Sequence, residues 1–181
     1  RQLVQAEEAI TDTGCLGLRL IVLGGEALDF ASLKPWFDRH GDQRPQLINM
    51  YGITESTVHV TYKVIKEVDL TASGPSLIGA PIPDLELYVL DSYRNLVPIG
   101  VAGELYVGGA GLARGYLNRD KLTAERFVGH LFDDGKVRRL FRSGDLARRR
   151  INGEIEYLGR IDQQVKVRGY RIELGEIEAM L

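Results

Sequence analysis

The sequence QLINMYGITE, residues 46–55, indicates the fold most clearly, because a short apolar strand leads directly into a cluster of polar groups. Upstream, LRLIVLGG at residues 18–25 is a continuous apolar run that is typical of a strand buried on both faces. Residues 31–42 predict a helix between these strands, with Pro35 in its first turn and Gly41 as its stop. Strand, helix and strand in this order predict an α/β layer with a mostly parallel sheet.

The pattern changes near residue 80, where short segments of alternating hydrophobicity begin, separated by Gly, Asn and Asp turns. Such segments predict an antiparallel sheet or a small barrel. From Gln163 onward the sequence predicts a hairpin that leads into a helix starting near Gly175. We therefore expect an α/β protein built from a parallel-sheet α/β part at residues 1–80, a small antiparallel β-barrel at 81–161, and the start of an α+β C-terminal part at 162–181.

The composition is that of an ordinary globular protein, with 44% hydrophobic and 27% charged residues and a formal net charge of −2. This charge gives no overall attraction to nucleic acid or to an anionic membrane. Cys15 is the single cysteine, which excludes an internal disulfide and favours a reducing compartment. The sequence contains no signal peptide and no apolar span long enough to cross a bilayer. We therefore expect a soluble, cytoplasmic protein with no nucleic-acid partner and no membrane partner.

Both ends of the chain have the character of cut ends. The chain begins without methionine on a helical segment that no N-cap residue precedes, and it closes where a helix near Gly175 has just begun. We therefore expect the 181 residues to be a piece of a longer polypeptide.

Three polar blocks carry the chemistry of the chain: residues 49–55, 143–145 and 159–162. The first places an amide, a phenol, a glycine, a hydroxyl and a carboxylate at a strand end, where ligands collect in α/β sheets. An aromatic face suits a nucleotide base, and carboxylate oxygen suits Mg²⁺. The other two blocks add a carboxylate and an arginine, which can complete a site for ribose and phosphate. Taken singly, each block is also compatible with a solvated turn.

In this order the three blocks resemble those of adenylate-forming enzymes, the acyl/aryl-CoA ligase superfamily, and specifically the adenylation domains of nonribosomal peptide synthetases. NMYGITESTVHVTY at residues 49–62 is similar to the family's Asn-x-Tyr-Gly-Pro-Thr-Glu block, with Ile53 at the proline position. LFRSGDLARR at residues 140–149 is similar to the Thr-Gly-Asp-Leu block, with Ser143 at the threonine position. Residues 159–178 give the longest match. The resemblance covers essentially the whole chain and places its first part late in the N-terminal core.

The resemblance implies a site for ATP or AMP with Mg²⁺, and it gives a role to each polar residue of the first block. Tyr51 stacks on adenine, and Asn49 hydrogen-bonds the adenine edge. Thr54 contacts the α-phosphate and Glu55 ligates Mg²⁺, and these two are the expected catalytic residues. The strand-end glycines of the expected nucleotide site are Gly24, Gly25 and Gly52.

The same resemblance completes the nucleotide site with residues of the later blocks. Asp145 accepts hydrogen bonds from the ribose hydroxyls, Arg160 contacts ribose and phosphate, and Tyr157 is a neighbour of the ribose. Asp162 is the hinge about which a small C-terminal domain rotates between two steps of the reaction.

Alignment to the family also gives the expected pocket for the substrate side chain: Ile21, Leu23, Met50, Val58 and His59. Isoleucine, methionine, valine and histidine in this order resemble pockets that accept threonine-like amino acids, whereas Leu23 is larger than the residue usual at its position. The alternative is that all five residues pack a core and that His59 is a satisfied core histidine.

The family's reaction is the ATP-dependent formation of an aminoacyl-adenylate, followed by transfer to the phosphopantetheine thiol of a carrier domain. The implied partners are an amino acid substrate and the peptidyl carrier and condensation domains of the same synthetase. The 181 residues lack the family's phosphate loop with lysine, its upstream pocket aspartate and its C-terminal lysine, so we expect the chain to be inactive alone. Two alternatives remain open: a fragment of an acyl- or aryl-coenzyme A ligase, and a non-catalytic module that binds nucleotide or a carrier protein.

Other signals in the sequence have simpler explanations. The glycine-rich stretch at residues 103–127 departs from the dinucleotide and P-loop patterns, and tight turns account for its glycines. A basic cluster at residues 136–150 fits a solvated sheet face, because it offers no interleaved aromatic platform for bases. His40 and His130 have no partner at metal-ligand spacing, and Cys15 has no recognisable activating neighbour.

Overall fold

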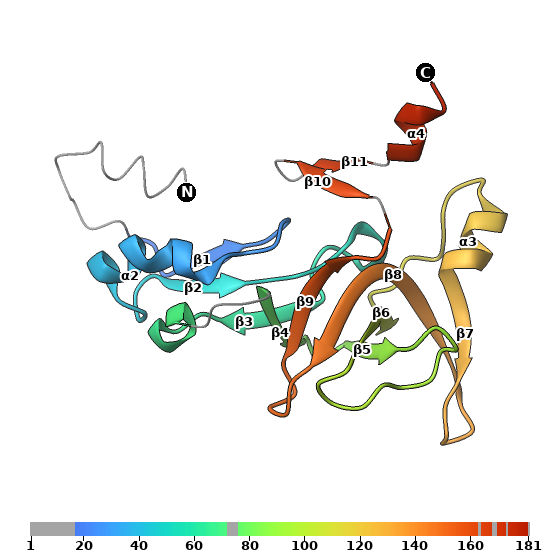
Figure 1. Ribbon diagram of the computed structural model, residues 1–181, viewed down its shortest axis with the longest axis horizontal. Helices are drawn as coiled ribbons and strands as arrows, with labels where there is room; N and C mark the ends of the chain where they lie inside the picture. Colours follow the sequence, from blue (N-terminus) through green and yellow to red (C-terminus); the bar gives the residue numbers. More distant parts are fainter. Residues whose placement is uncertain (1–16, 72–75, 163, 168–169, 173, 181) are drawn as a thin grey trace.

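The computed structural model describes residues 17–71, 76–162, 164–167, 170–172 and 174–180 (Figure 1). In this described part, a nine-stranded sheet runs in the order β1-β2-β3-β4-β9-β8-β6-β5, with β7 paired to β8, and β10 and β11 form a separate hairpin. The elements of the first half are β1 (Leu20–Leu23), η1 (Phe30–Leu33), α2 (Lys34–His40), β2 (Gln46–Asn49), η2 (Thr54–Ser56), β3 (Thr61–Val64), η3 (Glu67–Thr71) and β4 (Ser76–Pro81). Those of the second half are β5 (Leu85–Leu90), β6 (Ala102–Gly109), α3 (Asp120–Arg126), β7 (Phe127–Leu131), β8 (Val137–Arg149), β9 (Ile155–Arg160), β10 (Val165–Val167), β11 (Tyr170–Ile172) and α4 (Leu174–Glu178).

The predicted strand, helix and strand at the start of the chain are confirmed. β1 and β2 pair in parallel, with Ile21 opposite Leu47, and η1 and α2 form the crossover between them. Asp29 caps η1 through its side chain, Pro35 lies in the first turn of α2, and Gly41 ends that helix with a φ of 65°. A positive φ strains any residue with a Cβ, so glycine suits this stop.

The parallel pairing does not extend further along the described chain. β3 returns antiparallel to β2, and β4 pairs antiparallel with both β3 and β9. The large sheet is therefore continuous across residue 80, where the sequence predicts a change from one part to the next. The mostly parallel sheet that the sequence predicts is, in the described residues, one parallel pair joined to an antiparallel sheet.

The expectation that the strand at residues 18–25 is buried on both faces is wrong for the described structure. Leu20 and Val22 are 53% and 51% exposed, whereas Ile21 and Leu23 are half-buried and pack against the apolar cluster beneath α2. Among the described residues, η1 and α2 cover the face of β1 that carries Ile21 and Leu23, and the face that carries Leu20 and Val22 is left exposed (Figure 1).

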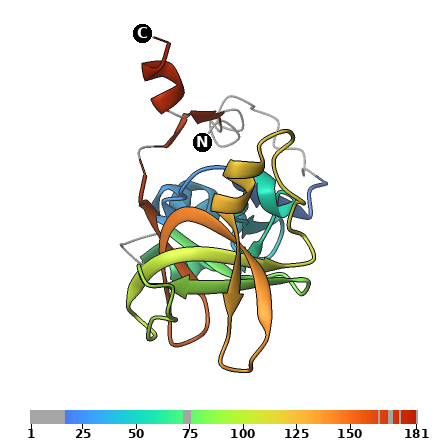
Figure 2. The same ribbon diagram turned by 90° about the vertical axis from the view of Figure 1, so that its right-hand side faces the viewer.

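The antiparallel part expected beyond residue 80 forms a strongly curved sheet. β8 is its longest strand, with 13 residues, and it pairs with β6, β7 and β9. Gly144 lies within β8 at a φ of 74°, and β8 arches over the rest of the sheet (Figure 2). This curvature wraps the sheet around an apolar core, as expected of a small barrel.

The core joins the two halves of the chain. Tyr51 and Ile53, which follow β2, belong to the same buried cluster as side chains from the curved sheet. The other buried members of this cluster are Val60, Ile78, Leu85, Leu87, Val89, Leu105, Val107, Phe127, Phe141, Ala147 and Ile155. The first polar block is therefore held against the antiparallel sheet by hydrophobic packing.

The C-terminal hairpin and helix agree with the prediction. β10 and β11 pair antiparallel, α4 follows them, and this unit stands apart from the large sheet in both views (Figures 1 and 2). Among the described residues, no helix has the length and apolar character that crossing a membrane requires. The helical character of the first ten residues and the surroundings of Cys15 lie outside the described residues.

Candidate functional site

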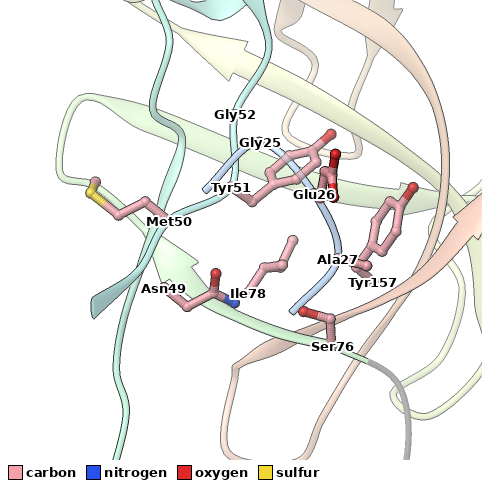
Figure 3. Close-up of a pocket in the computed structure, with 10 residues that line it drawn as sticks. All are labelled: Gly25, Glu26, Ala27, Asn49, Met50, Tyr51, Gly52, Ser76, Ile78 and Tyr157. Atoms are coloured by element: carbon pink, nitrogen blue, oxygen red, sulfur yellow. The ribbon is translucent and has the colours of Figure 1, made fainter. Parts of the chain in front are cut away.

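A pocket lies where the ends of β1 and β2 meet β4 and β9 (Figure 3). It is lined by Gly25, Glu26, Ala27, Asn49, Met50, Tyr51, Gly52, Ser76, Ile78 and Tyr157. Gly24 allows the two strand ends to approach, because a Cβ there would lie 2.8 Å from the Met50 carbonyl oxygen. The Ser76 hydroxyl accepts a hydrogen bond of 3.1 Å from the Leu28 N–H, which fastens the loop after β1 to β4.

Asn49 is the last residue of β2 and is 3% exposed. Its side-chain nitrogen donates a 2.7 Å hydrogen bond to the Leu77 carbonyl. That bond fixes the amide, and the side-chain oxygen points toward the side of the pocket where Tyr51 lies (Figure 3). The oxygen can therefore accept a hydrogen bond from an amino group in the pocket, which is the chemistry expected of a contact to the adenine edge.

Tyr51 connects this pocket to the second polar block, 94 residues later in the chain. The Tyr51 hydroxyl donates a short hydrogen bond to Oδ2 of Asp145, which is 2% exposed. The Ser143 hydroxyl accepts a 3.0 Å hydrogen bond from the Asp145 N–H and donates one of 2.6 Å to the Leu105 carbonyl. The Tyr51 hydroxyl thus holds the Asp145 carboxylate, while the Ser143 hydroxyl ties the Asp145 backbone to β6.

Arg160 brings the third polar block to the same carboxylate. Its Nη1 donates to Oδ1 of Asp145 at 3.0 Å and to the Ser143 carbonyl at 2.9 Å. Its Nε donates to Oδ1 of Asp162 at 2.8 Å, and its Nη2 also contacts that carboxylate. One guanidinium therefore links the expected ribose acceptor to the expected hinge residue.

The protonation of these groups follows from burial and from their neighbours. Burial and the adjacent Asp145 raise the pKa of Tyr51 well above its usual value, and they raise that of Tyr157 to about 12. Burial alone would raise the pKa of Asp162, but hydrogen bonds from Arg160 outweigh it and lower that pKa. At neutral pH the site therefore combines two neutral phenols with a guanidinium that remains charged.

Thr54 and Glu55 lie in η2, directly after the pocket. The turn before them is tight, since a Cβ at Gly52 would lie only 1.6 Å from the Val58 carbonyl oxygen. Thr54 is exposed, whereas Glu55 is 5% exposed and its Oε1 accepts a 2.6 Å hydrogen bond from the Tyr116 hydroxyl. The turn after the pocket residue Gly52 thus carries one accessible hydroxyl and one oriented carboxylate.

Comparison with known proteins gives a family for this arrangement. The family model described as AMP-binding enzyme matches residues 1–117. The chain belongs to this family. It is 55% identical over 181 residues to a dimodular nonribosomal peptide synthase of Bacillus subtilis (strain 168), covering 99% of this chain and 8% of the relative. It is 51% identical over 170 residues to a syringomycin synthase of Pseudomonas syringae pv. syringae, covering 94% of this chain and 27% of the relative.

Solved structures of this family have the same fold. A nonribosomal peptide synthetase protein containing adenylation and PCP domains superposes with a TM-score of 0.85 at 34% identity, over 98% of this chain and 34% of that one. The chain thus spans about a third or less of the length of these relatives. The resemblance to peptide-synthetase adenylation domains, expected from the three polar blocks, is confirmed.

Within this AMP-binding fold, the five residues expected in the substrate pocket lie on β1, directly after β2 and just before β3. Met50 lines the pocket described above, although its side chain extends away from Tyr51 (Figure 3). Ile21 and Leu23 pack against the cluster beneath α2. Val58 is 62% exposed at a φ of 74°, and His59 is half-buried beside it. A substrate pocket formed by these five residues stays a prediction.

The glycine-rich stretch contains a site neighbour that the sequence analysis missed. Tyr116 bonds Glu55 from a loop 61 residues away in the chain, and no local pattern around residue 116 signals that contact. The sequence indicated only that this stretch is a loop between a strand and a helix. The contact with η2 is seen in the structure, where the Ala113 N–H also bonds the Glu55 carbonyl.

The basic cluster at residues 136–150 is largely neutralised by its own surroundings. Arg142 bonds Glu104, and Arg148 and Arg150 both bond the buried Glu156. Arg139 donates to two backbone carbonyls of the glycine-rich stretch. These contacts support the interpretation of the cluster as a structural sheet face.

Proposed function

We propose that this chain forms the nucleotide-binding part of an adenylation domain that activates an amino acid. The observation that supports this most strongly is the buried convergence of Tyr51, Asp145 and Arg160 beside the oriented amide of Asn49. A carboxylate that is 2% exposed and fixed by a phenol and a guanidinium is suited to accept hydrogen bonds from ribose hydroxyls. Each of its oxygens can accept more than one hydrogen bond, so a ribose can be added to the existing contacts.

In the proposed reaction, a carboxylate oxygen of the amino acid attacks the α-phosphorus of ATP. A phosphorus–oxygen bond forms, the bond to the bridging oxygen breaks, and pyrophosphate leaves. The thiol of a carrier-bound phosphopantetheine then attacks the acyl carbonyl, the thiol proton is lost, and AMP leaves. The residues of this chain contribute by position and charge: Asn49 and Tyr51 hold the base, Asp145 holds the ribose, and Thr54 and Arg160 face the phosphate region.

Glu55 is the proposed ligand of Mg²⁺. Its carboxylate is a hard oxygen donor in the turn that follows the pocket residue Gly52, and the described residues contain no cluster of three or more His, Cys, Asp or Glu side chains. A single protein carboxylate is enough for Mg²⁺, because this ion usually retains several water ligands and takes the others from nucleotide phosphates. When bound, Mg²⁺ would neutralise charge on the phosphates.

The proposed partners are an amino acid with a threonine-like side chain and the carrier and condensation domains of one synthetase. Support for the carrier domain comes from the solved relative, which contains adenylation and PCP domains. Asp162 is the proposed hinge. It follows β9 directly, and the hairpin and helix that stand apart from the large sheet come after it (Figure 1).

We also propose that the 181 residues alone do not activate a substrate, since the phosphate loop and the C-terminal lysine expected from the resemblance are absent from them. Both proposals are tested by ATP–pyrophosphate exchange, measured on the chain alone and on the chain with its native flanking sequence. The longer protein is expected to catalyse exchange with an amino acid, and the short one is not. Robust exchange by the short chain would overturn the second proposal.

The same assay separates the competing functions. Exchange with a fatty or aryl acid, but with no amino acid, would assign the protein to the coenzyme A ligases. Absence of exchange with every acid, together with retained binding of AMP, would indicate a non-catalytic nucleotide-binding module. Either outcome contradicts the proposed amino acid activation.

A further inference from the structure

The glycine-rich loop after β6 lies directly on the turn that carries Glu55. The Ala113 N–H donates a 2.8 Å hydrogen bond to the Glu55 carbonyl, and the Thr57 hydroxyl donates one of 2.7 Å to the Gly111 carbonyl. A Cβ at Gly111 would lie 3.3 Å from the Ser56 carbonyl oxygen, so glycine permits this close approach. The loop therefore fixes the backbone carbonyl of Glu55 and the side chain of Thr57, two residues later.

The side chain of Glu55 is fixed from the same loop. Its Oε1 accepts a 2.6 Å hydrogen bond from the Tyr116 hydroxyl, at a position where Glu55 is 5% exposed. Tyr116 is itself held at two points, because its N–H donates to the Thr123 hydroxyl at 2.9 Å and its ring packs edge-on against Phe127, with centroids 5.8 Å apart. The hydroxyl is thus presented to the carboxylate by a well-supported ring.

We propose that Tyr116 is a positioning residue that orients the Glu55 carboxylate for a divalent cation, an inference that rests on the proposed function. A buried carboxylate requires hydrogen-bond donors, and a donor on one oxygen restricts rotation of the whole group. Outer partners of this kind orient metal-ligating carboxylates, and removing them commonly weakens metal binding or activity by about 10- to 100-fold. The glycine-rich stretch then has a role beyond turn formation, because it carries and supports this phenol.

The test compares Tyr116→Phe with Tyr88→Phe in the protein with its native flanking sequence. Tyr88 is a matched control, since its hydroxyl donates a 2.7 Å hydrogen bond to Glu86, an exposed carboxylate of the curved sheet. Equilibrium dissociation constants are measured for AMP without metal and for ATP with and without Mg²⁺. Tyr116→Phe is expected to weaken the Mg²⁺-dependent part of ATP binding about 10-fold and to leave AMP binding unchanged. Tyr88→Phe is expected to change neither.

An equal loss of AMP and Mg²⁺–ATP binding in Tyr116→Phe would show that the phenol only supports the fold, and unchanged binding of both would show that it does not position Glu55. Either result overturns the inference while the proposed function stands. If the unsubstituted protein binds ATP no better with Mg²⁺ than without it, the proposed metal site itself fails. Should Tyr116→Phe not fold, Thr123→Val removes the hydroxyl that accepts the Tyr116 N–H. The same selective loss is then expected, and its absence would overturn the inference.

Discussion

The hydrogen bond from Tyr51 to Asp145 should contribute strongly to stability, and Tyr51→Phe tests this contribution. The substitution removes one hydroxyl and keeps the ring, which is 8% exposed and belongs to the main apolar cluster. Packing is therefore almost unchanged, and the perturbation is confined to the proton that the phenol donates to Asp145.

The expected magnitude follows from the burial of the acceptor. A hydrogen bond to a charged group contributes about 1.5–3 kcal/mol, and Asp145 at 2% exposure cannot replace it readily with water. For a chain of this size, about 1 kcal/mol corresponds to a shift of about 2–4 °C in melting temperature, so a decrease of about 3–12 °C is expected.

Because the pKa of Tyr51 is raised, the contribution of its hydroxyl to the free energy of unfolding is fully present below pH 10.0 and is lost as the pH rises through the folded pKa.

The assay is urea unfolding at pH 7, repeated above pH 10.0, where the contribution of the Tyr51 hydroxyl should decline, with Tyr93→Phe as the control. Tyr93 is 85% exposed, so loss of its hydroxyl should leave the free energy of unfolding within about 0.5 kcal/mol of the original value. If Tyr51→Phe is no less stable than this control, the link between the first two polar blocks does not stabilise the fold and the reasoning is refuted.

Two other substitutions probe the turn before Glu55 and the basic sheet face. Gly52→Ala should destabilise the protein by about 3 kcal/mol or more in urea unfolding, because the added Cβ would meet the Val58 carbonyl oxygen at 1.6 Å; an unchanged unfolding midpoint would contradict this. Burial alone would raise the pKa of Glu156, but hydrogen bonds from Arg148 and Arg150 outweigh it and lower that pKa below 4.5. The stability from this carboxylate is present above pH 4.5 and is lost as the pH falls through its folded pKa. Glu156→Gln should therefore make the free energy of unfolding depend less steeply on pH below 4.5. An equally steep dependence in this variant would count against the ion pairs.

Much of the fold could be predicted because the signals are local. Pro35 and Gly41 mark the two ends of α2, since each acts through the backbone of its own turn. The alternating segments beyond residue 80 become the antiparallel strands β5, β6, β8 and β9. Burial of β1 was predicted less well, because an apolar run such as residues 18–25 does not reveal which faces its neighbours cover.

The candidate site, too, was predictable where its signals are local and not where they depend on tertiary contacts. Asn49, Tyr51 and Glu55 could be selected as candidates because their chemistry lies together in one short block, and the family resemblance supplied the order of the later blocks. Nothing in the sequence shows that Tyr51 bonds Asp145 or that Tyr116 bonds Glu55, since these contacts join residues 94 and 61 positions apart.

The sequence by itself therefore determined the order of the elements, the turns between them and the family of the chain, because periodicity, turn residues and motifs depend on neighbouring positions. Only the tertiary structure decided that Arg160 bridges Asp145 and Asp162, and that the glycine-rich loop holds Glu55. The physical reason is that the curvature of the antiparallel sheet and the burial of a shared core bring these distant segments within hydrogen-bonding distance.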